Sequence, residues 1–312
     1  MDKLEPSIET NSGYVVPALI FTTVIWGINV PVMKVGLTGM SPLMFMTLRF
    51  VIAAITTFAV LGIKRQFRRM PGKDILRIAS ISFWGLFFNQ VLTLFGLPKT
   101  TAGNAALVLA TVPICVVLIN RVMNIEVITR RVALGVMTSL AGVFIIVLSV
   151  AKEFSLAGPH IFGALLILMG QFCYAYYTVF LKQLVSEYSI YQVSAIVMSV
   201  CSVYCCLVTL PEIVRIEWGS ISAVAWYSIA FSGIFALSLG NFIWFWGVKK
   251  IGSAKTSLYN NVVPVVSIAF AWLFLDEALS FVQTLGAAVV FWGLYLTRSQ
   301  PPQFVQLHKQ TN

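Results

Sequence analysis

Ten long apolar runs constrain the fold of this chain more than any other feature of its sequence. About 20 apolar residues of α-helix cross a bilayer core that is about 30 Å thick. Only 10% of the residues are charged, against about 25% in a soluble domain. The pattern predicts an all-α integral membrane protein with ten transmembrane helices. The expected spans are Val15–Val35, Pro42–Leu61, Ile75–Leu97, Ala102–Met123, Val132–Val150, Ile161–Leu181, Tyr191–Leu210, Val224–Val248, Leu258–Leu275 and Val282–Thr297.

The short segments between these runs carry most of the positive charge. The chain has 21 Lys and Arg residues against 11 Asp and Glu, a net charge of +10. If the N-terminus lies in the cytoplasm, all but five of the 21 fall on the cytoplasmic side. The positive-inside rule therefore places both tails, residues 1–14 and 298–312, in the cytoplasm of a cell with the chain in its (inner) membrane. This distribution accounts for the charge without a nucleic-acid partner. The five exceptions are Lys34, Arg49, Lys99, Lys152 and Arg215.

The sequence repeats itself at an offset of 151 residues. The first helices of the two halves match at an offset of 148, which pairs Trp26 with Tyr174 and Lys34 with Lys182. We therefore expect two repeats of five helices, residues 15–150 and 161–297. Because five is odd, the second repeat enters the membrane from the opposite face, as in secondary transporters whose substrate site lies near the midplane. The pairs at the offset of 151 are Gly96 with Gly247, Pro113 with Pro264, Glu126 with Glu277, Gly135 with Gly286 and Gly142 with Gly293.

Four segments carry a resemblance to a known family. They are Ile25–Lys34, Leu48–Phe50, Thr100–Ile114 and Lys249–Leu296, and the last combines a proline-containing helix, an acidic pair and a glycine-rich final helix. These segments resemble the EamA-type branch of the drug/metabolite transporter superfamily. The resemblance implies transport, usually export, of metabolites, amino acids or drug-like compounds. The family's usual Gly-Glu turn is changed in both halves, to Ile125-Glu126 and to Asp276-Glu277.

Polar and aromatic side chains within the predicted spans are the candidates for substrate binding. A central charge that faces lipid costs about 2.5–3.5 kcal/mol, so polar groups are expected to face the interior. Each amide could instead bond a neighbouring helix. Asn89 and Gln90 point about 100° apart, and we expect Gln90 to face the site. The candidates are Trp26, Asn29, Gln90, Gln171, Tyr174, Tyr177, Asn241, Trp244, Tyr259 and Asn260.

Matched prolines and glycines suggest where helices bend and pack. Pro113 and Pro264 each fall inside a predicted span, where the missing N–H bends a helix. Paired bends favour gating points for alternating access, with static bends as the alternative. The matched glycines favour close helix contacts, within the chain or in a homodimer. Lys34 and Arg49 match family positions, and both binding and structural roles remain open for them.

Residue types that are missing from the predicted spans narrow the function. No Asp or Glu is central in any span, and both histidines, His160 and His308, fall outside the spans. Intramembrane proteolysis and metal-dependent lipid transfer therefore lack their residues, and no metal or cofactor is expected. We expect a secondary transporter, not an enzyme, that exports amino-acid-like or similar small metabolites. Efflux of aromatic or cationic drug-like compounds is the alternative. Uniport or exchange fits at least as well as proton coupling through a terminal Glu.

Overall fold

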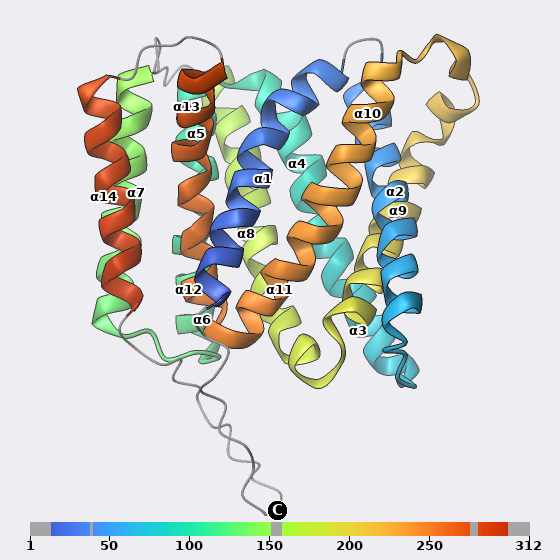
Figure 1. The fold of residues 1–312 in the computed structure, drawn as a ribbon, viewed down its shortest axis with the longest axis horizontal. Coiled ribbons are helices and arrows are strands. Elements are labelled where there is room, and N and C mark those ends of the chain that lie inside the picture. Colours follow the sequence, from blue (N-terminus) through green and yellow to red (C-terminus); the bar gives the residue numbers. More distant parts are fainter. Residues whose placement is uncertain (1–13, 38–39, 151–157, 275–279, 299–312) are drawn as a thin grey trace, which may run out of the picture.

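The protein is a bundle of helices (Figure 1). The structure is a computed structural model that describes residues 14–37, 40–150, 158–274 and 280–298. Segments labelled η are π- or 3₁₀-helical. The helices of the first half are α1 (Val15–Gly36), α2 (Pro42–Lys64), α3 (Gly72–Ile81), η2 (Ser82–Phe87), α4 (Phe88–Gly96), η3 (Leu97–Lys99), α5 (Ala102–Leu109), α6 (Val112–Met123) and α7 (Arg130–Val150). Those of the second half are α8 (Gly158–Glu187), α9 (Ile190–Ile213), η4 (Trp218–Ser220), α10 (Ala223–Phe231), η5 (Ser232–Leu239), α11 (Gly240–Ile251), α12 (Ser253–Ser257), η6 (Leu258–Val262), α13 (Val263–Phe274) and α14 (Phe281–Arg298).

The helices cross a membrane as the apolar runs predict. Eight helical stretches are long and apolar enough to span a bilayer, and Phe281–Thr297 is a shorter apolar helix. The broken stretch α12–η6–α13 completes the set. Large apolar side chains such as Ile55, Leu134 and Trp292 are exposed on the outside of the bundle, where lipid replaces water as the solvent. The prediction of an all-helical membrane protein with ten spans in two five-helix repeats is confirmed.

Each half places its third span against the other half. η2 packs against α8 and α9, whereas η5 packs against α1 and α2. Glycines allow this close approach. A Cβ atom added to Gly85 would lie 2.5 Å from Cβ of Tyr177, and one added to Gly233 would lie 2.8 Å from the carbonyl oxygen of Arg49. The interface between the halves therefore runs through the interior of the bundle.

Both third spans change their helical winding at equivalent places. A π-helical segment joins α3 to α4 at Ser82–Phe87, and another joins α10 to α11 at Ser232–Leu239. The offset of 151 residues maps Ser82 onto Gly233, so the two segments coincide in the repeat. A π turn inserts an extra residue and rotates the following side chains by about 100°. The expected spans Ile75–Leu97 and Val224–Val248 assumed regular winding, and the structure differs there.

The matched prolines begin helices and do not bend continuous ones. α5 ends at Leu109 and a new helix starts at Val112, so Pro113 lies in the first turn of α6. In the second half the 3₁₀ segment η6 ends at Val262, and Pro264 is the second residue of α13. The expectation of a proline inside an unbroken span is therefore wrong in this detail. Proline favours the first turn because its missing N–H has no intrahelical partner there.

The matched glycines pack α7 directly against α14, which lie side by side in Figure 1. A Cβ atom on Gly135 would lie 2.7 Å from the carbonyl oxygen of Gly293, and one on Gly142 would lie 2.7 Å from that of Gly286. The backbones can approach this closely only because neither helix has a side chain at these positions. Within the chain, then, these glycine faces already have their partners.

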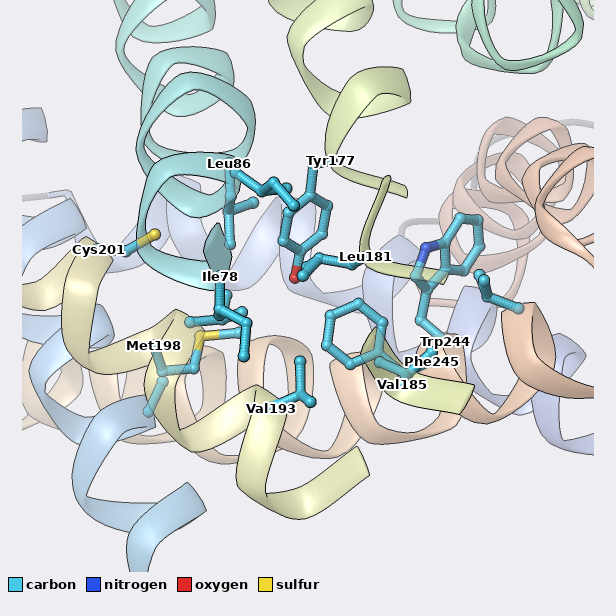
Figure 2. Packing of buried hydrophobic residues seen from close by; sticks show 14 of the residues in the cluster. Ile78, Leu86, Tyr177, Leu181, Val185, Val193, Met198, Cys201, Trp244 and Phe245 are labelled. Carbon is cyan, nitrogen blue, oxygen red and sulfur yellow. The ribbon is translucent and has the colours of Figure 1, made fainter. Parts of the chain in front are cut away.

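A continuous apolar core joins the two halves. Figure 2 shows Ile78 and Leu86 of the first half packed beside Tyr177 and Phe245 of the second. Trp244 is the largest fully buried side chain, with 1% of its surface exposed. The core therefore surrounds the polar groups that are described next.

Candidate functional site

Four aromatic rings form the centre of the candidate site. The ring centroids of Trp26 and Trp244 lie 5.3 Å apart, those of Tyr174 and Trp244 lie 6.1 Å apart, and those of Tyr174 and Tyr177 lie 5.8 Å apart. The indole Nε1 of Trp26 donates to the carbonyl oxygen of Ala236 at 2.9 Å. Because Ala236 lies in η5, the π-helical winding helps to hold this ring. α1, α8 and α11 thus bring together the predicted aromatic residues of both halves.

A buried hydrogen-bond chain adjoins the rings in the second half. The hydroxyl of Tyr177 donates to Oδ1 of Asn241 at 2.8 Å. The amide Nδ2 of Asn241 donates to Oγ of Ser194 on α9 at 3.2 Å. Nearby in the same core, Nε1 of Trp244 is buried without a hydrogen-bond partner. Since an unpaired buried donor is unfavourable, this N–H is a candidate contact for a polar substrate group.

A buried arginine defines the polar part of the first half. The side chain of Arg49 on α2 is 5% exposed, and its Nη2 donates to Oε1 of Gln90 on α4 at 2.6 Å. Its Nη1 lies 3.0 Å from Sδ of Met33 and 3.5 Å from Oγ of Ser232, and its Nε has no partner. The guanidinium also lies 5.7 Å from the centre of the Phe50 ring. Arg49 therefore joins spans of both halves inside the bundle.

The two polar clusters are related by the sequence repeat. Gln90 and Asn241 differ by 151 residues, the offset of the matched glycines and prolines. Each follows a π-helical segment, so equivalent winding directs both amides inward. Sequence reasoning selected both residues but missed their equivalence and the role of Arg49. The repeat offset contains the signal for the first of these, whereas the sequence match at Arg49 leaves binding and structural roles equally open.

The remaining candidate residues are buried in other surroundings. Asn29 donates to Sδ of Met33 at 3.2 Å, beside Arg49, and its Oδ1 has no partner. Gln171 donates to the carbonyl of Ile167, one turn earlier in its own helix. Tyr259 belongs to the same buried cluster as Tyr177 and Trp244. The Nδ2 group of Asn260 is buried without a partner.

Two neighbours of these candidates act as links between helices. Asn89 donates to the carbonyl of Gly170 on α8 at 2.9 Å, in a different direction from Gln90. Asn261 donates to Oγ of Ser139 on α7 at 2.9 Å. Each amide satisfies a buried polar group of another helix. They are therefore structural contacts in this conformation.

A buried ion pair ties the two halves together at one end of the bundle. Nζ of Lys182 on α8 lies 2.6 Å from Oε1 of Glu126, which follows α6. The same carboxylate accepts from the backbone N–H of Ser253 at 2.7 Å and of Ala254 at 3.2 Å, at the start of α12. Gly252, with φ of 87°, makes the tight turn before α12. Sequence reasoning matched Lys182 with Lys34 but did not pair it with Glu126.

Basic side chains mark the same end of the molecule. Arg65 and Arg68 of the α2–α3 connection and Lys249 of α11 lie around one pocket, together with the turn between α8 and α9. We call this end the basic face, and it lies toward the bottom of Figure 1. Nothing is described for Asp276, Glu277 or the side chain of Lys34. The second-half match of Glu126 therefore lies outside the described residues.

Two inverted halves that enclose amide, phenol, indole and guanidinium groups at their interface define a membrane carrier. The EamA-like transporter family matches residues 14–148 and again residues 161–299. The chain belongs to this family, as its sequence motifs predict, and is therefore a transporter and not an enzyme.

Relatives of similar length support this assignment. An uncharacterized transporter of Archaeoglobus fulgidus is 28% identical over 280 residues, which cover 89% of this chain and 96% of the relative. A probable amino-acid metabolite efflux pump of Escherichia coli K12 is 28% identical over 292 residues, covering 89% and 92%. One solved crystal structure matches with a TM-score of 0.78 and 17% identity, covering 91% of this chain and 98% of that chain. At that identity the likeness concerns the fold alone.

Proposed function

We propose that this protein exports amino-acid-like or similar small metabolites by alternating access. The observation that carries the proposal is the pair of repeat-related buried amides, Gln90 bonded to Arg49 and Asn241 bonded to Tyr177, together with the Trp26–Trp244 contact between the halves. Flat aromatic walls suit an apolar side chain, and the amides and Arg49 suit polar ends. The Escherichia coli relative, a probable amino-acid metabolite efflux pump, supports the same substrate class.

The proposed orientation places the basic face in the cytoplasm. Arg65, Arg68 and Lys249 gather at that face, and cationic loops favour the cytoplasmic side. Both chain ends, residues 1–14 and 298–312, then lie in the cytoplasm of a cell whose inner membrane holds the two repeats, 15–150 and 161–297. Transport from the basic face to the opposite face is export.

Closure at the basic face is assigned to the Glu126 cluster. Glu126 is bonded to Lys182 and to the N-terminal turn of α12, so it connects parts of both halves. Breaking these bonds would let the halves separate on the cytoplasmic side. Pro113 and Pro264 follow the broken points of their spans and remain the proposed hinges. The glycine faces of α7 and α14 are engaged within the chain, so a homodimer would need another surface.

Efflux of aromatic or cationic drug-like compounds is the second candidate. The contacts among Trp26, Tyr174 and Trp244 favour it, because flat rings bind aromatic compounds and cations. Arg49 opposes it for cations, since a buried guanidinium repels them. Substrate charge therefore separates the two proposals.

Flux through purified protein tests both proposals. Proteoliposomes containing the protein should release preloaded radiolabelled amino acids faster than protein-free liposomes, with competition among structurally related amino acids. Ethidium and acriflavine efflux should stay at the protein-free rate. Efflux of the dyes without amino-acid flux would favour the second candidate, and an absence of both would reject the proposed substrates.

A further inference from the structure

Arg49 is a buried cation held by weak partners. Its Nη1 shares one acceptor, Sδ of Met33, with Nδ2 of Asn29, at 3.0 and 3.2 Å. A thioether sulfur is a poor acceptor. The oxygen acceptors of the guanidinium are the amide of Gln90, 2.6 Å from Nη2, and the hydroxyl of Ser232, at a long 3.5 Å from Nη1. The Nε group of Arg49 has no partner. Two donors from α1 and α2 thus converge on a place where a better acceptor would be more stable.

The described part of the chain supplies no carboxylate to Arg49. The ion pair found in the described part of the chain joins Lys182 to Glu126, not to Arg49. Of the other acids that the structure describes, Asp74, Glu187 and Glu212 lie toward the ends of α3, α8 and α9, and Glu217 lies just before η4. A charge inside the membrane is costly unless a counter-charge or polar groups neutralise it. An anion that enters from outside the chain would meet this need.

We infer that Arg49 receives the carboxylate of the transported substrate, with Asn29 as a second donor. The carboxylate replaces Met33 as the acceptor shared by Nη1 of Arg49 and Nδ2 of Asn29, and its second oxygen accepts from Nη2, the neighbouring donor on the same edge of the guanidinium. Arg binds a carboxylate through two parallel, charge-assisted hydrogen bonds. A carboxamide offers one acceptor oxygen and no negative charge, so it cannot replace the carboxylate in this contact. The inference rests on the proposed function and narrows it to carboxylate-bearing metabolites.

A purely structural Arg49 makes a different prediction. The residue links α2 to Gln90 on α4, and the backbone at Arg49 packs against η5 at Gly233. If that were its whole role, replacing it would lower stability and leave ligand discrimination unchanged. Discrimination between a carboxylate and its carboxamide therefore separates the two roles.

Binding to purified protein in detergent tests the inference without requiring transport. The probes are the common L-amino acids, each paired with its carboxamide, and sodium chloride at matched ionic strength; the readout is the shift in melting temperature against ligand concentration. Wild type should bind at least one amino acid more tightly than its carboxamide. R49Q should weaken that amino acid about tenfold or more and leave the carboxamide unchanged.

Three further variants keep the test decisive. R49K keeps the charge without the planar fork, so it should retain part of the preference for the acid even if R49Q does not fold. M33L removes the sulfur acceptor that the carboxylate must displace, so it should bind amino acids at least as tightly as wild type, and weaker binding would count against the inference. Arg121, exposed at the end of α6, gives the matched control R121Q, which should behave as wild type.

Several outcomes would overturn the inference. They are equal binding of acids and carboxamides, equal binding by wild type and R49Q, an Arg49-dependent shift with chloride alone, and no binding of any amino acid. Flux then separates this inference from the proposed function. Arg49-dependent binding without amino-acid flux rejects export and keeps the carboxylate contact. Amino-acid flux with the same KM in wild type and R49Q keeps export and rejects the contact.

Discussion

A few buried contacts determine the roles of individual polar residues in this protein. Tyr177 and Asn241 form a hydrogen bond of 2.8 Å, and Lys182 and Glu126 form an ion pair of 2.6 Å. Both contacts are buried in a chain with few charges. A buried polar group that loses its partner costs about 1–3 kcal/mol, and a buried charge costs more. Single substitutions in these two pairs should therefore have large effects on transport or on stability.

Asn241→Ala should reduce flux through the proposed site. The variant removes the amide beside Trp244 and leaves the Tyr177 hydroxyl unpaired, at a cost of about 1–3 kcal/mol. Tyr177→Phe is the more conservative change, because it removes one hydroxyl and retains the ring and its packing. We expect both to lower flux in proteoliposomes while the folded protein remains monodisperse in size-exclusion chromatography. Gln171→Ala, which loses only a bond within its own helix, should have a smaller effect; wild-type flux in all three would remove these residues from the site.

Glu126→Gln should destabilise the described conformation, in which we propose that the Glu126 cluster closes the basic face. It leaves Lys182 buried without its counter-ion, and breaking such a pair costs about 3–5 kcal/mol in an interior, with the lower end expected near the membrane surface. The double variant Glu126→Gln/Lys182→Met should recover part of the loss, since the two effects are coupled. Thermal unfolding in detergent measures each variant. Additive effects of the two substitutions would show that the ion pair contributes no coupling.

At the scale of helices, irregular winding and close packing position the site. η2 and η5 lie at equivalent places in the repeat and precede Gln90 and Asn241. The glycines of α7 and α14 permit backbone contact on the other side of the bundle. Both features depend on one-residue or one-atom differences. They can therefore be tested by equally small changes.

Deletion of Phe235 should abolish transport. This exposed residue lies in η5, and removing one residue from a π-helical segment restores α-helical winding. Asn241 and Trp244 then rotate by about 100° relative to α10 and lose their contacts with Tyr177 and Trp26. Substitution of Phe235 by Ala is the control, because it keeps the residue count, and flux should then persist. Equal flux in both variants would show that the π winding is not required.

Gly142→Ala should weaken the packing of α7 on α14. The added methyl would lie 2.6 Å from the backbone N of Val290 and 2.7 Å from the carbonyl of Gly286, neither of which can rotate away. Overpacking of this kind costs about 1–3 kcal/mol. Gly62→Ala on α2 is the control, because nothing lies within 4 Å of its added Cβ. Melting temperatures should fall for the first variant and stay or rise for the second.

The whole molecule is an interlocked pair of inverted halves. η2 lies against α8 and α9, and η5 lies against α1 and α2, so neither half has a complete interior by itself. The polar groups of the site come from both halves and lie where the halves contact each other. The arrangement requires the connections on the basic face to lie on one side of the membrane.

Cysteine labelling in whole cells tests this orientation. Phe67 lies at the pocket of the basic face. Gly219 lies in η4, which precedes the N-terminal end of α10, whereas α11 continues from the other end of that span. Both residues are exposed. An impermeant maleimide should label Gly219→Cys in intact cells and Phe67→Cys only after permeabilisation. The native cysteines that are described are buried or half-buried, which keeps the background low. Labelling of Phe67→Cys in intact cells would reverse the proposed direction of the chain.

The sequence by itself determined the membrane class, the number of spans and the repeat. These follow from local properties, because each span must satisfy its own backbone and present apolar side chains to lipid. The repeat offset likewise needs no contacts, only matched letters such as Pro113 with Pro264. The aromatic candidates Trp26, Tyr174 and Trp244 were also predicted from local sequence, because they lie beside polar residues within the predicted spans.

The tertiary structure decided what local patterns could not contain. The pairing of Arg49 with Gln90, and of Lys182 with Glu126, joins residues from different helices. Whether two such residues meet depends on the direction of each side chain, which accumulates along a helix at about 100° per residue. A π-helical segment shifts that direction for every residue that follows it. Sequence periodicity assumes regular winding, so only the folded arrangement could show which polar groups share the interior.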